Sequence, residues 1–142
     1  MVREEVMDLF TAPRGYCLAH CISGDFALGA GIAKEFDKRY NMRARLHELY
    51  PDYFDQGYLG SALAVDEVFN LVTKDKAFQK PTYEHLRLAL EDMKTVMNDF
   101  GVTKVAMPLI GCGLDRLEWS KVKNILEDIF SEDKYDILVC RL

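Results

Sequence analysis

The chain has 142 residues, 49% of them hydrophobic, and a formal net charge of −5 at pH 7. This length and apolar content suit one domain with a proper core, which we place over residues 1–142. The acidic charge argues against a protein that binds duplex nucleic acid through general attraction to phosphate. Because no apolar run reaches the length of a membrane span and the first residues do not resemble a signal peptide, we expect a cytoplasmic protein without membrane contact.

The first half of the chain predicts two strands and then two helices. Apolar runs predict a short strand followed by a buried one, over residues 2–6 and 16–22. Apolar positions at helical spacing predict the helices, at 32–39 and 42–49. The stretch 51–60 begins with a proline that ends the second helix, and it is expected to be an exposed loop.

The second half predicts a strand pair and a long helix, and then a strand, a helix and a strand. Residues 62–65 and 68–73 are expected to pair around a turn. Thr82 is the expected cap of the long helix, and Gly101 ends it. The remaining elements are expected at 105–110, 122–130 and 135–140. This alternation predicts a layered α/β domain whose loops at strand ends form the functional site.

Two apolar strands each lead into a loop with two glycines separated by one residue. Gly29 and Gly31 follow the first strand, and Gly111 and Gly113 follow the second. Glycines let backbone N–H groups approach an anion without a Cβ in the way, so the pair of loops predicts a site that holds a diphosphate. Neither loop has the third small residue of a dinucleotide-binding fingerprint or the Gly-Lys-Ser/Thr ending of a P-loop.

Four cysteines occur, at Cys17, Cys21, Cys112 and Cys140. Their spacing suits neither a disulfide framework nor a zinc site, so we expect reduced, small apolar residues and no metal. Cys112 lies in the second glycine loop, where a thiolate would repel a phosphate, and its small size is the better explanation. His20 alternates within an apolar strand, which indicates a packed, hydrogen-bonded side chain, and Trp119 is expected to pack rather than to stack on a purine.

A basic stretch follows the first glycine loop and contains Lys34, Lys38, Arg39, Arg43 and Arg45. At helical spacing these residues are expected to form a solvated face. The alternative is that they steer an anionic substrate.

Six segments, taken in order, resemble a macrodomain, and the branch they resemble most is that of the terminal ADP-ribose protein glycohydrolases. They are residues 8–10, 19–23, 29–33, 73–74, 80–84 and 108–116. The resemblance covers nearly the whole chain. It implies an α/β fold, a single macrodomain with a mixed central sheet flanked by helices in a three-layer α/β/α arrangement, and ADP-ribose bound in a cleft at the ends of the strands.

By this resemblance, Asp8 and Leu9 would hold the adenine end and Leu142 would close it. Ser23 and the first glycine loop would line the distal ribose and the pyrophosphate, and the second glycine loop would hold the other phosphate. The residues expected to bind ADP-ribose are Asp8, Leu9, His20, Ser23, Gly29, Ala30, Gly31, Ile32, Leu109, Ile110, Gly111, Cys112, Gly113, Leu114 and Leu142.

Lys74 and Asp115 fall on the catalytic lysine and aspartate of the branch. The resemblance implies that Lys74 attacks C1″ of the ribose to form an imine-type intermediate, and that Asp115 serves as general base and acid. A lysine attacks only as the neutral amine, so the surroundings of Lys74 must allow it to lose its proton. Without the resemblance, Lys74 in the polar stretch 73–76 would be interpreted as a surface lysine.

The implied function is a hydrolase that removes mono- or terminal ADP-ribose from acidic side chains, without metal or cofactor. Its partners would be ADP-ribose and ADP-ribosylated protein, and we expect a monomer. Two alternatives stay open: a hydrolase of ADP-ribosylated nucleic acid bases, and a reader that binds ADP-ribose without turnover.

Overall fold

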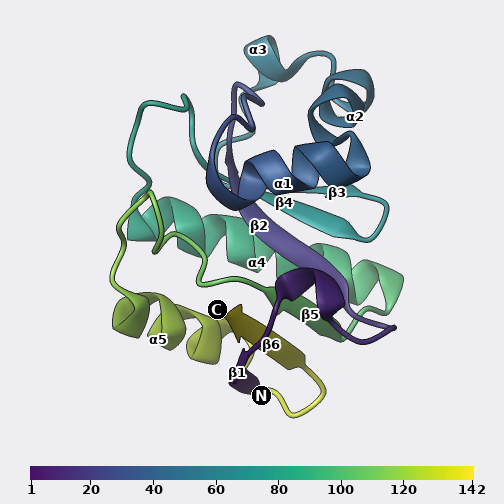
Figure 1. Cartoon of the computed structure of the whole chain (residues 1–142), viewed down its shortest axis with the longest axis vertical. Helices are drawn as coiled ribbons and strands as arrows, with labels where there is room; N and C mark the ends of the chain where they lie inside the picture. The colour runs from purple at the N-terminus through teal and green to yellow at the C-terminus, as the bar shows by residue number, and fades with distance from the viewer.

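The computed structural model describes residues 1–142, except for the side chains at positions 54 and 56. Its centre is a six-stranded sheet with the order β1-β6-β5-β2-β4-β3 (Figure 1). The strands are β1 (Val2–Val6), β2 (Cys17–Ser23), β3 (Ala62–Val65), β4 (Val68–Lys74), β5 (Lys104–Met107) and β6 (Asp136–Arg141). Only the β3–β4 pair is antiparallel, so the prediction of a mixed sheet is confirmed.

Helices cover both faces of the sheet. They are the 3₁₀ helix η1 (Leu9–Thr11) and the α-helices α1 (Gly31–Tyr40), α2 (Met42–Leu49), α3 (Tyr53–Gln56), α4 (Tyr83–Phe100) and α5 (Trp119–Ile129). In Figure 1, α1 and α2 lie on one side of the sheet and α4 and α5 on the other. Phe36 and Leu46 belong to the core on the first side, and Leu90 and Leu126 to the core on the second. The predicted three layers are therefore present.

The long helix forms as its sequence predicts. The Thr82 side chain accepts a hydrogen bond from the His85 N–H at 3.1 Å, which caps the first turn. Gly101 ends the helix in the left-handed conformation, with φ of 69°. Its apolar face, which includes Leu86 and Met93, is fully buried against the sheet and α5.

Two elements differ from their predictions. The strand expected over 105–110 ends at Met107, because Pro108 has no N–H to continue the ladder and the chain turns toward Gly111. The expected loop over 51–60 contains the short helix α3, so that expectation was wrong in part. The Tyr53 ring stacks on Phe26 at 4.8 Å, and this packing gives the segment a structure that its polar composition does not predict.

The parallel strands set the position of the functional site. Because β1, β6, β5, β2 and β4 all run in one direction, their carboxyl ends meet at one edge of the sheet. Ser23, Lys74 and Arg141 are the last residues of β2, β4 and β6 and lie at this edge, which we call the carboxyl edge. No helix among the described residues is long and apolar enough to span a bilayer.

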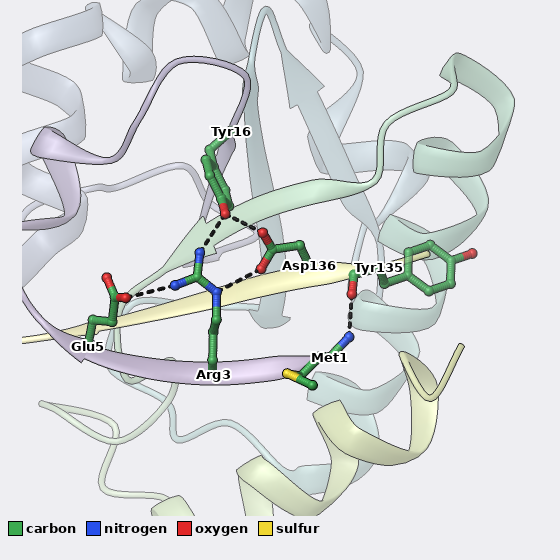
Figure 2. Close-up of polar contacts among 6 residues, drawn as sticks. All are labelled: Met1, Arg3, Glu5, Tyr16, Tyr135 and Asp136. Atoms are coloured by element: carbon green, nitrogen blue, oxygen red, sulfur yellow. Dashed lines mark hydrogen bonds and ion pairs between the residues drawn. The ribbon is translucent and has the colours of Figure 1, made fainter. Parts of the chain in front are cut away.

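A polar network ties β1 to β6 near the opposite end of the sheet, which we call the amino edge. Arg3 donates to Asp136 Oδ1 at 3.1 Å and to the Tyr16 hydroxyl at 2.7 Å, and the Tyr16 hydroxyl donates to Asp136 (Figure 2). The hydrogen bond with Asp136 raises the pKa of Arg3 further above its ordinary value. Figure 2 also shows the amino group of Met1 bound to the carbonyl of Tyr135. These contacts anchor the first strand and the loop before β2.

Candidate active site

A cleft of about 510 Å³ lies at the carboxyl edge of the sheet. Its walls are the loop after β2, at residues 27–31, and the loop after β5, at residues 108–115. Residues 140–142 close a further side. A larger hollow of about 730 Å³, between η1, α2 and the β3–β4 turn, contains neither Lys74 nor Asp115. The carboxyl-edge cleft is therefore the one that holds the predicted catalytic residues.

Lys74 and Asp115 meet inside this cleft. Lys74 Nζ lies 2.7 Å from Asp115 Oδ1, although the two residues are 41 positions apart in the chain. Their side chains are 15% and 18% exposed, so the pair is largely withdrawn from water but reachable from the cleft. In the part of the chain that the structure describes, neither side chain has another hydrogen-bond or ion-pair partner. Both groups therefore keep the capacity to bond a ligand.

The end of β4 is held tightly against the loop after β2. The register shifts after Ile22, so that Ser23 pairs with Lys74. The Gly24 N–H then donates to the Lys74 carbonyl at 2.8 Å. A Cβ at Gly24 would lie 3.3 Å from the Asp75 carbonyl oxygen, and only glycine permits so close an approach without a shift.

The four glycines of the two loops serve two different purposes. Gly31 and Gly111 have φ of 59° and 72°, which side-chain-bearing residues rarely adopt. A Cβ at Gly111 would also lie 2.8 Å from Leu117 Cδ1. Gly29 and Gly113 have no positive φ, and a Cβ at Gly113 would meet nothing within 4 Å. Gly31 and Gly111 therefore set the backbone course of the loops, whereas Gly113 leaves space open beside the cleft.

The cysteines of the cleft are protonated at neutral pH. Burial and, to a smaller extent, the nearby charge of Asp115 raise the pKa of Cys21 to about 12. Burial also raises the pKa of Cys112. Burial likewise raises the pKa of Cys140, which also lines the cleft, to about 11. Because the thiolate is the reactive form, none of the three is suited to be a nucleophile.

Comparison with known proteins agrees with this geometry. No protein-family profile matches the chain. A human protein named ADP-ribose glycohydrolase OARD1 is 42% identical over 137 residues, which cover 95% of this chain and 88% of that protein. The chain belongs to the macrodomain family, in the branch of this glycohydrolase.

Solved structures show the same fold. The macrodomain of Mycobacterium tuberculosis DarG superposes with a TM-score of 0.86 at 22% identity, covering 99% of this chain and 97% of that one. Thermosipho africanus DarTG, solved in complex with ADP-ribose, has a TM-score of 0.75 at 14% identity, covering 94% of this chain and 39% of that one. At these identities the likeness concerns the fold alone.

Most residues predicted to bind the ligand line the cleft of this macrodomain. They are Ser23, Gly29, Ala30, Gly31, Ile32, Leu109, Ile110, Gly111, Cys112, Gly113, Leu114 and Leu142, together with Lys74 and Asp115. Ala77 and Lys80 also line the cleft, and the sequence did not predict them as site residues. Lys80 Nζ donates to the Leu114 carbonyl at 3.1 Å, which joins the loop after β4 to the loop after β5. Its sequence signal was its place at the start of the segment 80–84, one of those that resemble a macrodomain.

Three predicted ligand residues do not line the cleft. His20 is fully buried, its ring stacks on Phe36 at 3.8 Å, and its Nε2 lies 2.6 Å from Asn70 Oδ1. Burial lowers the pKa of His20 to about 4, so it is a neutral core residue. Its prediction as a ligand contact is corrected, whereas the packed, hydrogen-bonded side chain that the strand pattern indicates is present.

Leu9 and Asp8 are the other two. Leu9 is 4% exposed and packs in the core beneath α1, with its open side toward the larger hollow. The Asp8 carboxylate caps η1 by accepting from the Phe10 N–H at 3.0 Å. Asp8 nevertheless lies close to the cleft. Its neighbour Met7 donates its N–H to the carbonyl of Arg141, a cleft residue, at 2.8 Å, and the charge of Asp8 contributes to the raised pKa of Cys140. Burial keeps Leu9 out of the cleft, whereas Asp8 is exposed and lies beside the cleft with one carboxylate oxygen engaged in the cap.

The basic stretch is largely bound to protein groups. Arg39 pairs with Glu35 at 2.8 Å, Arg45 pairs with Asp66, and Arg43 donates to the Phe26 carbonyl at 3.3 Å. None of its five basic residues is among the described residues that line the cleft. This arrangement fits a partly neutralised outer face better than a track for phosphates.

Proposed function

We propose that this macrodomain removes mono- or terminal ADP-ribose from acidic side chains by hydrolysing the ester at C1″, with Lys74 as nucleophile and Asp115 as the proton carrier. The observation that carries the proposal is the 2.7 Å contact between Lys74 Nζ and Asp115 Oδ1 inside the cleft. A protein that only binds ADP-ribose does not need this pair. The name of the human relative, a glycohydrolase, supports turnover.

Binding of the diphosphate is assigned to the two glycine loops. Helix α1 begins at Gly31, and Ala30 before it provides no side-chain cap. The first N–H groups of α1 are therefore available to an anion at the positive end of the helix dipole. The open space at Gly113 lets the second loop approach the other phosphate.

The chemistry begins with a proton transfer across the ion pair. Asp115 takes a proton from Lys74, and the neutral amine attacks C1″. The C1″–N bond forms while the C1″–O bond to the carrier breaks, and its electron pair leaves on the carboxylate. The nitrogen then passes one proton to the ring oxygen as the bond between C1″ and that oxygen breaks, which opens the sugar ring and gives the protonated imine. Water adds to C1″, the C1″–N bond breaks, and Asp115 returns its proton to the lysine amine. The ring oxygen closes again on C1″, which restores free ADP-ribose.

A panel of Glu-, Ser-, Arg- and base-linked ADP-ribose conjugates tests the substrate. We expect the Glu-linked conjugate to release ADP-ribose fastest, with little dependence on salt. A base-linked conjugate in a nucleic acid would bring flanking phosphates, and its turnover would fall steeply as salt rises. Preference for the base-linked conjugate, lost on charge reversal of Lys38 and Arg39, would replace the carboxylate ester by a nucleic acid substrate.

The covalent step has its own test. Borohydride added during turnover should reduce the imine and leave an adduct on Lys74, which peptide mass spectrometry would locate. An adduct elsewhere, or wild-type turnover in Lys74→Ala, would remove Lys74 as the nucleophile.

A further inference from the structure

Asp25 joins two loops that border the cleft, although it does not line the cleft itself. It lies in the loop after β2, two residues beyond Ser23. Its Oδ1 accepts the Ser23 hydroxyl at 2.5 Å and the Ala27 N–H at 3.2 Å. Its Oδ2 accepts the Ala77 N–H at 3.0 Å, from the loop after β4 and 52 positions away in the chain. One carboxylate thus connects both loops.

The bond to Ala77 completes a set of contacts around the backbone of Lys74. The Lys74 carbonyl is held by the Gly24 N–H at 2.8 Å, and Ala77 follows three residues later. Beyond Ala77, the Gln79 side chain closes the turn by accepting from the Lys76 N–H at 2.9 Å, and Lys80 reaches Leu114. Gly24 therefore attaches Lys74 itself to the loop after β2, and Asp25 attaches the segment beyond Lys74, at Ala77, to the same loop.

The ionised form of Asp25 suits this task. Burial alone would raise the pKa of Asp25, but the Ser23 hydroxyl, the Ala77 and Ala27 amides and the charge of Lys76 together bring it below its ordinary value. Both carboxylate oxygens are acceptors, and all three partners are donors. An asparagine has nearly the same shape but would point an NH₂ group at one set of donors. Asp25 is therefore suited to this place by its two acceptor oxygens, and not only by its size.

We propose that Asp25 is a positioning residue for the catalytic lysine, which fixes the loop after β4 so that Lys74 Nζ stays within reach of Asp115 and of C1″. This inference rests on the proposed function of Lys74. It predicts that loss of the bond between Asp25 and Ala77 harms the chemical step more than it harms binding, because the bonds of Asp25 to Ser23 and Ala27 lie within the loop after β2 and are made by its other oxygen.

Asp25→Asn and Asp75→Asn form a matched pair of variants. Asp75 lies in the loop after β4, next to Lys74, but its exposed side chain has no hydrogen bond or ion pair in the described part of the chain. We expect Asp25→Asn to lower kcat at least about tenfold, since small misplacements of a catalytic group are costly, while the Kd of free ADP-ribose rises less than about threefold. Asp75→Asn should change both by less than about twofold.

Hydrogen exchange at the Ala77 amide separates this inference from the proposed function. Asp25→Asn should speed that exchange without lowering the melting temperature by more than a few degrees, and Asp75→Asn should leave it unchanged. If the Ala77 amide exchanges in Asp25→Asn as slowly as in the wild type, or if it exchanges faster while kcat stays at the wild-type value, the proposed role of Asp25 is overturned. Wild-type turnover in Lys74→Ala would instead overturn the proposed function, whatever Asp25 does.

A second variant removes the donor of the hydrogen bond between Ala77 and Asp25 instead of its acceptor. Ala77→Pro removes the N–H that Asp25 accepts and leaves the Ser23 bond in place. It should also lower kcat more than binding, and the double variant should cost little more than either single one, because both remove the same interaction. Additive losses in kcat would show that Asp25 does not act through Ala77.

Discussion

The two ends of the sheet each place a cation beside a carboxylate, but they treat the pair differently. At the amino edge, Arg3 has three side-chain partners, and Asp136 accepts from both Arg3 and Tyr16. At the carboxyl edge, Lys74 and Asp115 have only each other among the described side chains. A fully bonded network stabilises one arrangement, whereas a singly bonded pair retains donors and acceptors for a substrate. The first is suited to stability and the second to chemistry.

Removing each cation should separate these roles most strongly. Lys74→Ala should lower turnover by at least about 10³-fold, because the proposed nucleophile is lost, with ADP-ribose affinity nearly unchanged. Arg3→Ala should keep kcat and cost about 1 kcal/mol of unfolding free energy, since its partners are partly exposed. Turnover assays, calorimetry with ADP-ribose and urea denaturation measure the three quantities. Equal kcat values in the two variants would contradict the comparison.

Removing each carboxylate should give the next largest difference. Asp115→Ala should reduce kcat by about 10²–10⁴-fold, which is the usual value of positioned proton transfer. Asp136→Ala should leave kcat unchanged and lower the melting temperature, because Arg3 and Tyr16 lose their acceptor. If Asp115→Ala loses only ADP-ribose binding and no chemistry is detected in the wild type, Asp115 is structural and a reader function is favoured.

Substitutions at the two glycines of the second loop should also separate ligand binding from stability, with smaller effects than those at the charged residues. Gly113→Val should weaken ADP-ribose binding by about tenfold without lowering the melting temperature, because its Cβ has open space in the free protein. Gly111→Ala should instead lower stability by about 1–3 kcal/mol, since φ of 72° is strained for alanine and its Cβ would crowd Leu117. Calorimetry and thermal melting measure the two effects. A destabilised Gly113→Val with normal affinity would reverse the assignment.

Ligand selectivity at the cleft depends on the space around C1″. Free ADP-ribose should bind measurably, and intact NAD much more weakly, because nicotinamide would occupy the space beside Lys74 and Asp115. Titration calorimetry with both compounds measures the ratio. Equal affinities would indicate a site open beyond C1″ and would favour a dinucleotide-dependent enzyme.

Local signals predicted much of this fold. Thr82 and Gly101 bound α4 as their chemistry predicts, and alternation in β2 indicated a buried His20. The left-handed backbone of Phe26 and Leu28, which have φ of 54° and 45°, has no such signal, because burial in the core holds these residues in a conformation that they rarely adopt.

The site was predictable only in part. The glycine spacing predicted the two loops, and Asp115 stands where the second loop ends on an acid. The meeting of Lys74 with Asp115 followed from family resemblance, since Lys74 is not marked by its neighbours. Asp25 was missed because its role depends on a backbone N–H 52 positions away. Contacts between distant loops are set by tertiary packing, and a single sequence does not encode them in any local pattern.

The smallest expected effect is the pH dependence of stability at the amino edge. Burial would raise the pKa of Asp136, but Tyr16 and Arg3 hold it below its ordinary value. A depressed folded-state pKa stabilises the protein above the unfolded value of about 3.9, and this contribution disappears as pH falls through the lower folded value. Asp136→Asn should therefore reduce stability at pH 7 and flatten its decline below about pH 4. Urea denaturation of both proteins between neutral and acidic pH measures the difference; parallel curves would mean that Asp136 titrates alike in the folded and unfolded chains and that the network at the amino edge does not depend on its charge.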